Sequence, residues 1–181
     1  MKQLGFLHCI FYYTFSHRGI LVLLVLGSIV GMVFAYYLQK VVGLDPCPLC
    51  VFQRIGLIGM GSFAFLSLIT QLQKRWAKLT LMILALLSIL WSVGVASWHI
   101  WLQNLPPSEA PACGPGLNYW IDTLPITQVF KEVFTGSGEC ALIDWTFLGF
   151  SLPQLSLLFF SVLALLVMLN IYILLQKNTK L

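Results

Sequence analysis

Charged side chains are scarce in this chain. Asp, Glu, Lys and Arg make up 9% of its 181 residues, whereas soluble domains average about 25%. So few charges cannot cover a water-soluble domain of this length, which excludes that class and predicts an integral membrane protein. The net charge is only +4, and we expect the partner of this surface to be a lipid bilayer and not a nucleic acid. The length suits one domain, over residues 1–181.

Four apolar segments are long enough to cross a membrane as helices, which need ~20 mostly apolar residues to span a ~30 Å hydrocarbon core. Continuous apolar runs differ from the alternating segments of a β-barrel, so we predict an all-α, four-helix transmembrane bundle. The first segment is followed by bulky residues (AYYLQK) and no small-x-small cleavage site, so we expect it to be retained. The predicted helices cover about 19–38, 49–72, 79–102 and 155–175, with outer loops at about 39–48 and 103–154.

Acidic residues are absent from both chain ends and from the short loop at 73–78. These three segments hold seven of the ten basic residues, whereas all six acids fall in the two outer loops. The positive-inside rule therefore predicts that both termini are cytoplasmic and that the long second loop lies outside. The seven basic residues are Lys2, Arg18, Lys74, Arg75, Lys78, Lys177 and Lys180, and the acids are Asp45, Glu109, Asp122, Glu132, Glu139 and Asp144.

Four of the five cysteines lie on the predicted outer side. Cys47 and Cys50 precede or open the second helix, and Cys113 and Cys140 lie in the long loop. Disulfides persist outside the cytoplasm, so these four can pair, whereas Cys9 is expected to be a reduced thiol. Four cysteines allow three connectivities, and pairing within each couple is the simplest.

Two structural roles remain as alternatives for these cysteines. Closing the Gly- and Pro-rich long loop removes roughly 3–4 kcal/mol of unfolded-state entropy, so Cys113–Cys140 can be a staple. A four-cysteine zinc site is disfavoured, because the second pair is not Cys-x-x-Cys and an oxidising compartment disfavours free thiolates. We therefore expect no metal site.

The motif PCPLC at 46–50 is poorly suited to be a staple, because two intervening residues close almost no chain. Cys50 is expected near the N-terminus of the second helix, where unpaired backbone N–H groups favour a thiolate. In a regular helix Arg54 lies one turn beyond Cys50 on the same face, where its cation would stabilise that thiolate or another anion. The alternative for Arg54 is a side chain that reaches back to the membrane interface.

His99 lies near the outer end of the third helix, flanked by Trp98 and Trp101. Aromatic residues at a membrane interface often serve as anchors, and His99 can belong to such a belt. Its imidazole can equally hydrogen-bond a polar ligand or relay protons. The sequence leaves both roles open.

The stretch PCPLCVFQR at 46–54 resembles the Pro-Cys-x-x-Cys-x-x-x-Arg signature of the DsbB family. The likeness covers nearly the whole chain. It includes the four helices, the second cysteine pair, PITQVF before GSGEC, and DWTFLGFSLPQ leading into the last helix. The order also differs from the vitamin K epoxide reductase family, which places its Cys-x-x-Cys late in the chain.

The resemblance implies a quinone-dependent protein thiol:disulfide oxidoreductase of the bacterial inner membrane, with its redox sites facing the periplasm. Members of the family reoxidise a DsbA-like thioredoxin-fold oxidase and pass its electrons to membrane quinone, ubiquinone or menaquinone. The alternatives are a non-catalytic scaffold stapled by two disulfides, a dedicated variant serving one specialised partner, and a reductase that carries electrons outward.

The resemblance also implies roles for six side chains. Four cysteines are redox-active: Cys113 forms the mixed disulfide with the partner, Cys140 completes that pair, Cys47 exchanges with it, and Cys50 faces the quinone. Two further residues, Arg54 and His99, bind the quinone.

Two positions depart from this pattern. Gln53 stands where many members carry an acid, and its amide does not offer the acid's proton-carrying group. Cys9 has no role that the resemblance supplies.

Overall fold

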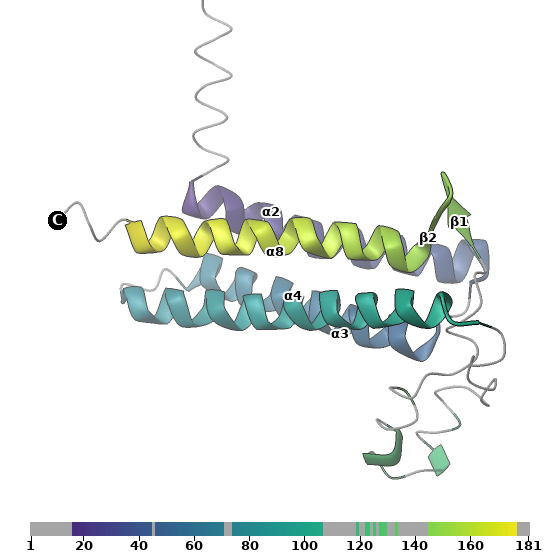
Figure 1. The fold of residues 1–181 in the computed structure, drawn as a ribbon. Helices are drawn as coiled ribbons and strands as arrows, with labels where there is room; N and C mark the ends of the chain where they lie inside the picture. The colour runs from purple at the N-terminus through teal and green to yellow at the C-terminus, as the bar shows by residue number, and fades with distance from the viewer. Residues whose placement is uncertain are drawn as a thin grey trace, which may run out of the picture.

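The computed structural model describes residues 16–44, 46–70, 74–106, 119, 122–123, 125, 127–129, 133 and 145–176. Four long helices in this part of the chain form an antiparallel bundle (Figure 1). They are α2 (His17–Tyr37), α3 (Pro48–Ile69), α4 (Arg75–Gln103) and α8 (Leu152–Gln176), and a π-helical segment η1 (Leu38–Val42) continues α2. Helix α3 packs against α2 and α4, and α8 packs against α4 and α2, so the contacts close a ring.

All four helices, with η1 extending the first, are long and apolar enough to cross a membrane, which confirms the predicted four spans. Three of them extend beyond the predicted bounds because a helix continues through polar residues outside the apolar run, whereas α3 ends at Ile69, before the predicted residue 72. The first helical segment reaches Val42, not residue 38, and stops where Gly43 adopts a φ of 78°. Helix α4 begins at Arg75, four residues before the predicted start.

A short hairpin interrupts the otherwise helical fold immediately before α8. Strand β1 (Thr146–Phe147) pairs antiparallel with β2 (Phe150–Ser151), with Thr146 opposite Ser151. The two turn residues, Leu148 and Gly149, both have positive φ values, as a tight two-residue hairpin turn requires. Composition and hydropathy gave no indication of this hairpin within the predicted outer loop.

Small side chains let α3 approach its neighbours closely. A Cβ atom added at Gly56 would lie 2.6 Å from the backbone oxygen of Ser88 on α4. Ser92 Oγ on α4 donates a hydrogen bond of 2.8 Å to the backbone oxygen of Gln53. On the other side Ser28 Oγ on α2 donates one of 3.1 Å to an α3 carbonyl. These contacts set the distance between the elements that carry the candidate site.

The two ends of the bundle are built differently. At one end the side chains of His17 and Asn170 bond each other at 2.9 Å, and Arg75 donates to the Leu175 carbonyl oxygen at 2.8 Å. At the other end, where α3 begins and α4 ends, lies a second apolar cluster against which Cys47 packs. It consists of Leu49, Val95, Leu102, Val129 and Val133. The last two belong to the long segment between α4 and the hairpin, so part of that segment sits on the bundle.

Candidate functional site

Cys47 is the N-cap of α3. Its backbone is extended, and its Sγ accepts a hydrogen bond of 3.3 Å from the backbone N–H of Cys50. A cysteine thus takes the role that Ser, Thr, Asp or Asn usually plays at a helix start. Pro48 occupies the first helical position, where its missing N–H leaves no partner unsatisfied. The predicted placement of the pair at the helix N-terminus is confirmed.

The Cys47 and Cys50 sulfur atoms lie 2.8 Å apart, and both side chains are half-buried. The Cys47 sulfur accepts one of the unpaired backbone N–H groups at the start of α3, and these groups favour negative charge. The capping geometry therefore places the pair for conversion between dithiol and disulfide at a site that suits a thiolate.

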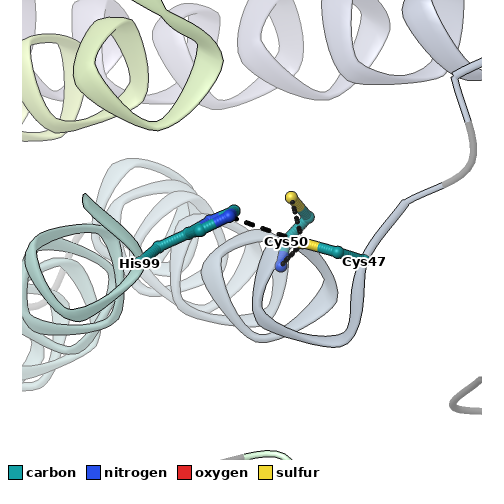
Figure 2. Close-up of side chains that lie close together, drawn as sticks. All are labelled: Cys47, Cys50 and His99. Atoms are coloured by element: carbon teal, nitrogen blue, oxygen red, sulfur yellow. Dashed lines mark hydrogen bonds between the residues drawn. The ribbon is translucent and has the colours of Figure 1, made fainter. Parts of the chain in front are cut away.

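His99 points from α4 toward the cysteine pair (Figure 2). Its Nε2 lies 3.9 Å from Cys47 Sγ, its Nδ1 lies 3.4 Å from Gln53 Nε2, and only 3% of the residue is exposed. The flanking Trp98 and Trp101 are exposed and stack on each other at 4.5 Å. The two tryptophans therefore suit the interface belt, whereas the imidazole faces inward and lies next to the Cys-x-x-Cys motif.

Arg54 crosses from α3 to α2. Its Nη1 donates a hydrogen bond of 2.9 Å to Gln39 Oε1 in η1, and its Nη2 donates one of 3.4 Å to the Ala35 carbonyl oxygen. A guanidinium has five N–H donors, so donors remain beyond these two contacts. The half-buried cation is thus held against the neighbouring helix by two hydrogen bonds.

A cavity of about 350 Å³ opens between α2, α3 and α8. Cys50, Gln53 and Arg54 contribute to its wall, which confirms that Cys50 and Arg54 share one helix face. Within the described residues the wall includes neither Cys47 nor His99. Most of the lining is apolar, with Phe34, Leu38, Leu57, Leu155, Phe159 and Phe160 among its members.

Cys50 therefore lies between two environments. On one side it contacts Cys47, with His99 close by, and on the other its side chain lines the apolar cavity. The predicted role of His99 in binding a quinone stays a prediction, since the imidazole lies on the side of Cys47. Cys113, Cys140 and Cys9 fall outside the described residues.

Sequence reasoning did not identify the contacts of Gln39 or Gln53. Each is a polar side chain at the edge of an apolar span, and a buried amide needs a hydrogen-bond partner. The sequence did show a polar residue at position 53 inside an apolar span, and the structure shows that this residue is 4% exposed and so needs a partner. The partner itself depends on how the helices are rotated against each other, which one sequence does not give.

Comparison with known proteins identifies the family of the chain. A sequence model of the family described as "Disulfide bond formation protein DsbB" matches residues 17–170. Proteins named "Disulfide bond formation protein B" from Acinetobacter baumannii and Acinetobacter baylyi are 57% and 55% identical to this chain over 150 residues, which is 83% of this chain and 88% of each relative. The protein of that name from Psychrobacter arcticus is 48% identical over 165 residues, covering 91% of this chain and 94% of the relative. The chain belongs to the DsbB family of disulfide bond formation proteins.

Proposed function

We propose that this protein reoxidises a periplasmic thioredoxin-fold oxidase similar to DsbA and passes the electrons to membrane quinone. The observation that carries this proposal is the position of Cys50. Its sulfur lies 2.8 Å from Cys47 Sγ, and its side chain lines an apolar cavity together with Arg54. A redox-active dithiol beside an apolar pocket suits electron transfer from protein thiols to a membrane-soluble acceptor.

The residues of the cavity fit a quinone. Phe34, Phe159 and Phe160 offer flat apolar walls, and the remaining N–H donors of Arg54 suit a carbonyl oxygen. Ligand pockets are usually apolar with few placed polar groups and span about 300–1,000 Å³, so the volume of about 350 Å³ suits a ring-sized group. A bound quinone supplies a two-electron acceptor that side chains cannot provide.

Four cysteines carry the proposed electron route. A reduced partner thiolate attacks Cys113 of the Cys113–Cys140 disulfide, and the partner leaves oxidised when its second thiolate displaces Cys113. The resulting loop dithiol reduces the Cys47–Cys50 disulfide in the same two steps, with a mixed disulfide at Cys47 and Cys50 as the leaving thiolate. Each exchange breaks one S–S bond and forms another, so two electrons move per cycle and end on Cys47 and Cys50.

Three side chains assist the last pair. The Cys47 sulfur accepts the backbone N–H of Cys50 and lies 3.9 Å from His99 Nε2, so both groups can stabilise it when it leaves as a thiolate. Arg54 supplies a fixed cation on the face where Cys50 meets the cavity. Gln53 supports the imidazole, because its Nε2 lies 3.4 Å from His99 Nδ1, the ring nitrogen that does not face Cys47.

The proposed setting is the bacterial inner membrane with the cysteine end toward the periplasm. Arg18, Lys74, Arg75 and Lys78 lie near the α2 start and the α4 start, which is the end of the bundle opposite Cys47 (Figure 1). Basic residues favour the cytoplasmic side, so this distribution supports the orientation. In intact spheroplasts treated with a reductant, a membrane-impermeant thiol reagent should label Cys113 or Cys140 and not Cys9, and labelling of Cys9 alone would reverse the assignment.

A turnover assay tests the function. The full-length protein in lipid nanodiscs receives a reduced periplasmic dithiol oxidase and either ubiquinone or menaquinone, and quinone reduction is followed by absorbance. We expect Cys50→Ala to lower turnover to the uncatalysed background, whereas Cys9→Ala keeps wild-type turnover as the matched control. Undiminished turnover in Cys50→Ala would contradict the assigned route.

A scaffold stapled by two inert disulfides gives a different result. In that case both disulfides remain oxidised when a reduced partner is added without quinone. The proposed oxidase instead shows electrons accumulating as free thiols on Cys47 and Cys50, which alkylation and mass spectrometry detect.

A further inference from the structure

Cys47, Cys50 and His99 form a cluster of soft metal ligands in the described part of the chain. Their three ligand atoms, two Sγ and one imidazole nitrogen, all lie within 4.8 Å of one another. We propose that the reduced form of this pair, together with His99, binds a thiophilic divalent cation of the zinc type. Such binding holds the pair in its reduced state.

The geometry lies close to that of a zinc site. Zn–S bonds of about 2.3 Å and Zn–N bonds of about 2.0–2.1 Å put tetrahedral ligand atoms roughly 3.3–3.8 Å apart. Cys47 Sγ and His99 Nε2 are 3.9 Å apart, near that spacing. The two sulfurs are 2.8 Å apart and have to separate by about 1 Å to bind one cation together, so the proposal requires a side-chain rotation at one of the two cysteines. Figure 2 shows that His99 already points at the pair from the facing helix.

Gln53 supports the imidazole in this role. A metal-bound histidine usually donates its other ring N–H to an acceptor, which fixes the tautomer. The Gln53 amide lies at His99 Nδ1, and a primary amide offers a carbonyl oxygen as well as N–H groups. A turn of the amide therefore presents the acceptor that Nδ1–H requires when Nε2 binds the cation.

Charge balance also favours this ligand set. Two thiolates neutralise one dication, so the complex adds no net charge to a half-buried site. Binding to the dithiol releases two protons and leaves the oxidation state of sulfur and metal unchanged. Three protein ligands leave a fourth position for water.

The site depends on redox state. A sulfur in the Cys47–Cys50 disulfide has no thiolate to offer, so only the reduced pair binds the cation. The bound cation in turn holds both sulfurs away from disulfide formation, and excess zinc therefore arrests the protein in its reduced form. This inference goes beyond the proposed function, because binding needs neither quinone nor a protein partner.

Direct titration tests the site. Full-length protein in detergent, with Cys9, Cys113 and Cys140 replaced by serine, retains Cys47 and Cys50 as its only thiols. The reduced, oxygen-free protein is titrated with Cd²⁺, whose thiolate charge-transfer absorbance reports binding, and then with Zn²⁺ as competitor. We expect one Cd²⁺ per reduced chain and none in the same protein oxidised to the disulfide.

Variants separate the three ligands. Cys50→Ser should abolish the cadmium band. His99→Asn should weaken binding by more than about tenfold, since loss of an outer-shell partner alone costs roughly 10–100-fold. His17→Asn removes a histidine at the opposite end of the bundle and is the matched control. Thermal unfolding checks that each variant is folded, and His99→Gln replaces His99→Asn where the latter is not.

Two results would overturn the proposal. One is cadmium binding of equal strength in the oxidised protein, and the other is an unchanged affinity when His99 is replaced in a folded variant. Because the assay contains no quinone and no partner, its failure leaves the proposed oxidase function standing. Absence of quinone turnover together with normal metal binding would instead contradict the proposed oxidase function and leave the metal site standing.

Discussion

Cys50 joins two chemical environments through one side chain. Its backbone N–H bonds the Cys47 sulfur, and its own side chain forms part of the cavity wall. A residue at the third position of a helix has its side chain directed by the first turn, so the Cys-x-x-Cys spacing fixes this arrangement locally. The different surroundings of the two cysteines are therefore a consequence of helix geometry at the start of α3.

Gln39 is expected to position Arg54. Gln39→Leu removes the acceptor at 2.9 Å from Nη1 and leaves the weaker contact at 3.4 Å to the Ala35 carbonyl oxygen. A hydrogen bond to a charged group contributes roughly 1.5–3 kcal/mol. Because one contact remains, we expect the lower end, which is about a tenfold rise in the KM for quinone with little change in kcat. Steady-state kinetics over a range of quinone concentrations measures both.

Two further variants provide the upper and lower references for this change in KM. Arg54→Leu should raise the KM for quinone more than Gln39→Leu does, because it removes the cation itself. Gln176→Leu alters an exposed glutamine at the far end of α8 and should leave both constants unchanged. Equal KM values for Gln39→Leu and the unaltered protein would show that Arg54 does not need this contact.

Among the elements, the α3–α4 interface decides whether His99 reaches the cysteines. Gly56→Ala puts a Cβ 2.6 Å from the Ser88 backbone oxygen and nearer still to Ser92 Oγ. Overpacking of this kind costs about 1–3 kcal/mol, against a helix-propensity gain of about 1 kcal/mol. We expect Gly56→Ala to lower the unfolding temperature in detergent and to slow turnover.

Gly94→Ala on α4 is the matched control, since nothing lies within 4 Å of its added Cβ. This substitution should leave the unfolding temperature unchanged or raise it slightly, and turnover should stay normal. If the two variants behave alike, close approach at Gly56 is not what holds the two helices in register.

The sequence predicts those elements that depend on neighbouring residues. Four apolar runs indicate four helices, and Pro48 with a Cys-x-x-Cys marks the start of α3 because proline suits the first helical position. The shared face of Cys50 and Arg54 follows from helical spacing alone.

Features that depend on packing were beyond the sequence. The link from Arg54 to Gln39 joins two helices whose relative rotation no local pattern specifies. The same holds for His99, whose burial, at 3% exposed, and whose distance to Cys47 depend on how α4 packs against α3. The predicted helix ends differ for another reason. Hydropathy marks only the part of a helix that crosses the hydrocarbon core, whereas α4 begins before that part, at Arg75.

At the scale of the whole molecule, two described residues of the segment between α4 and the hairpin lie in the apolar cluster beside the first cysteine pair. Val129 and Val133 are buried in the same apolar cluster as Leu49, and Cys47 packs against this cluster. Val133 precedes Cys140 by seven residues, so the chain between them spans at most about 25 Å. A tether of this length gives a high effective concentration of one cysteine pair at the other.

This anchor leads to a prediction about the exchange between the two pairs. Val133→Asp puts a carboxylate at a fully buried position and should release the segment from the bundle. We expect transfer from the loop pair to Cys47 and Cys50 to slow by about tenfold or more, since the tether no longer concentrates the reactants. Rapid acid quench, alkylation and mass spectrometry follow the thiols of each pair after a reduced partner is added.

The exposed position Tyr119 in the same segment provides the control, because Tyr119→Asp adds the same charge without disturbing the cluster. Both variants should accept electrons from the partner at the normal rate, since that step occurs at the loop pair itself. The expected pattern is thus a loop pair that becomes reduced on time in Val133→Asp while Cys47 and Cys50 lag behind. If Cys47 and Cys50 become reduced equally fast in both variants, the valine anchor plays no part in electron transfer, and the loop reaches the bundle without it.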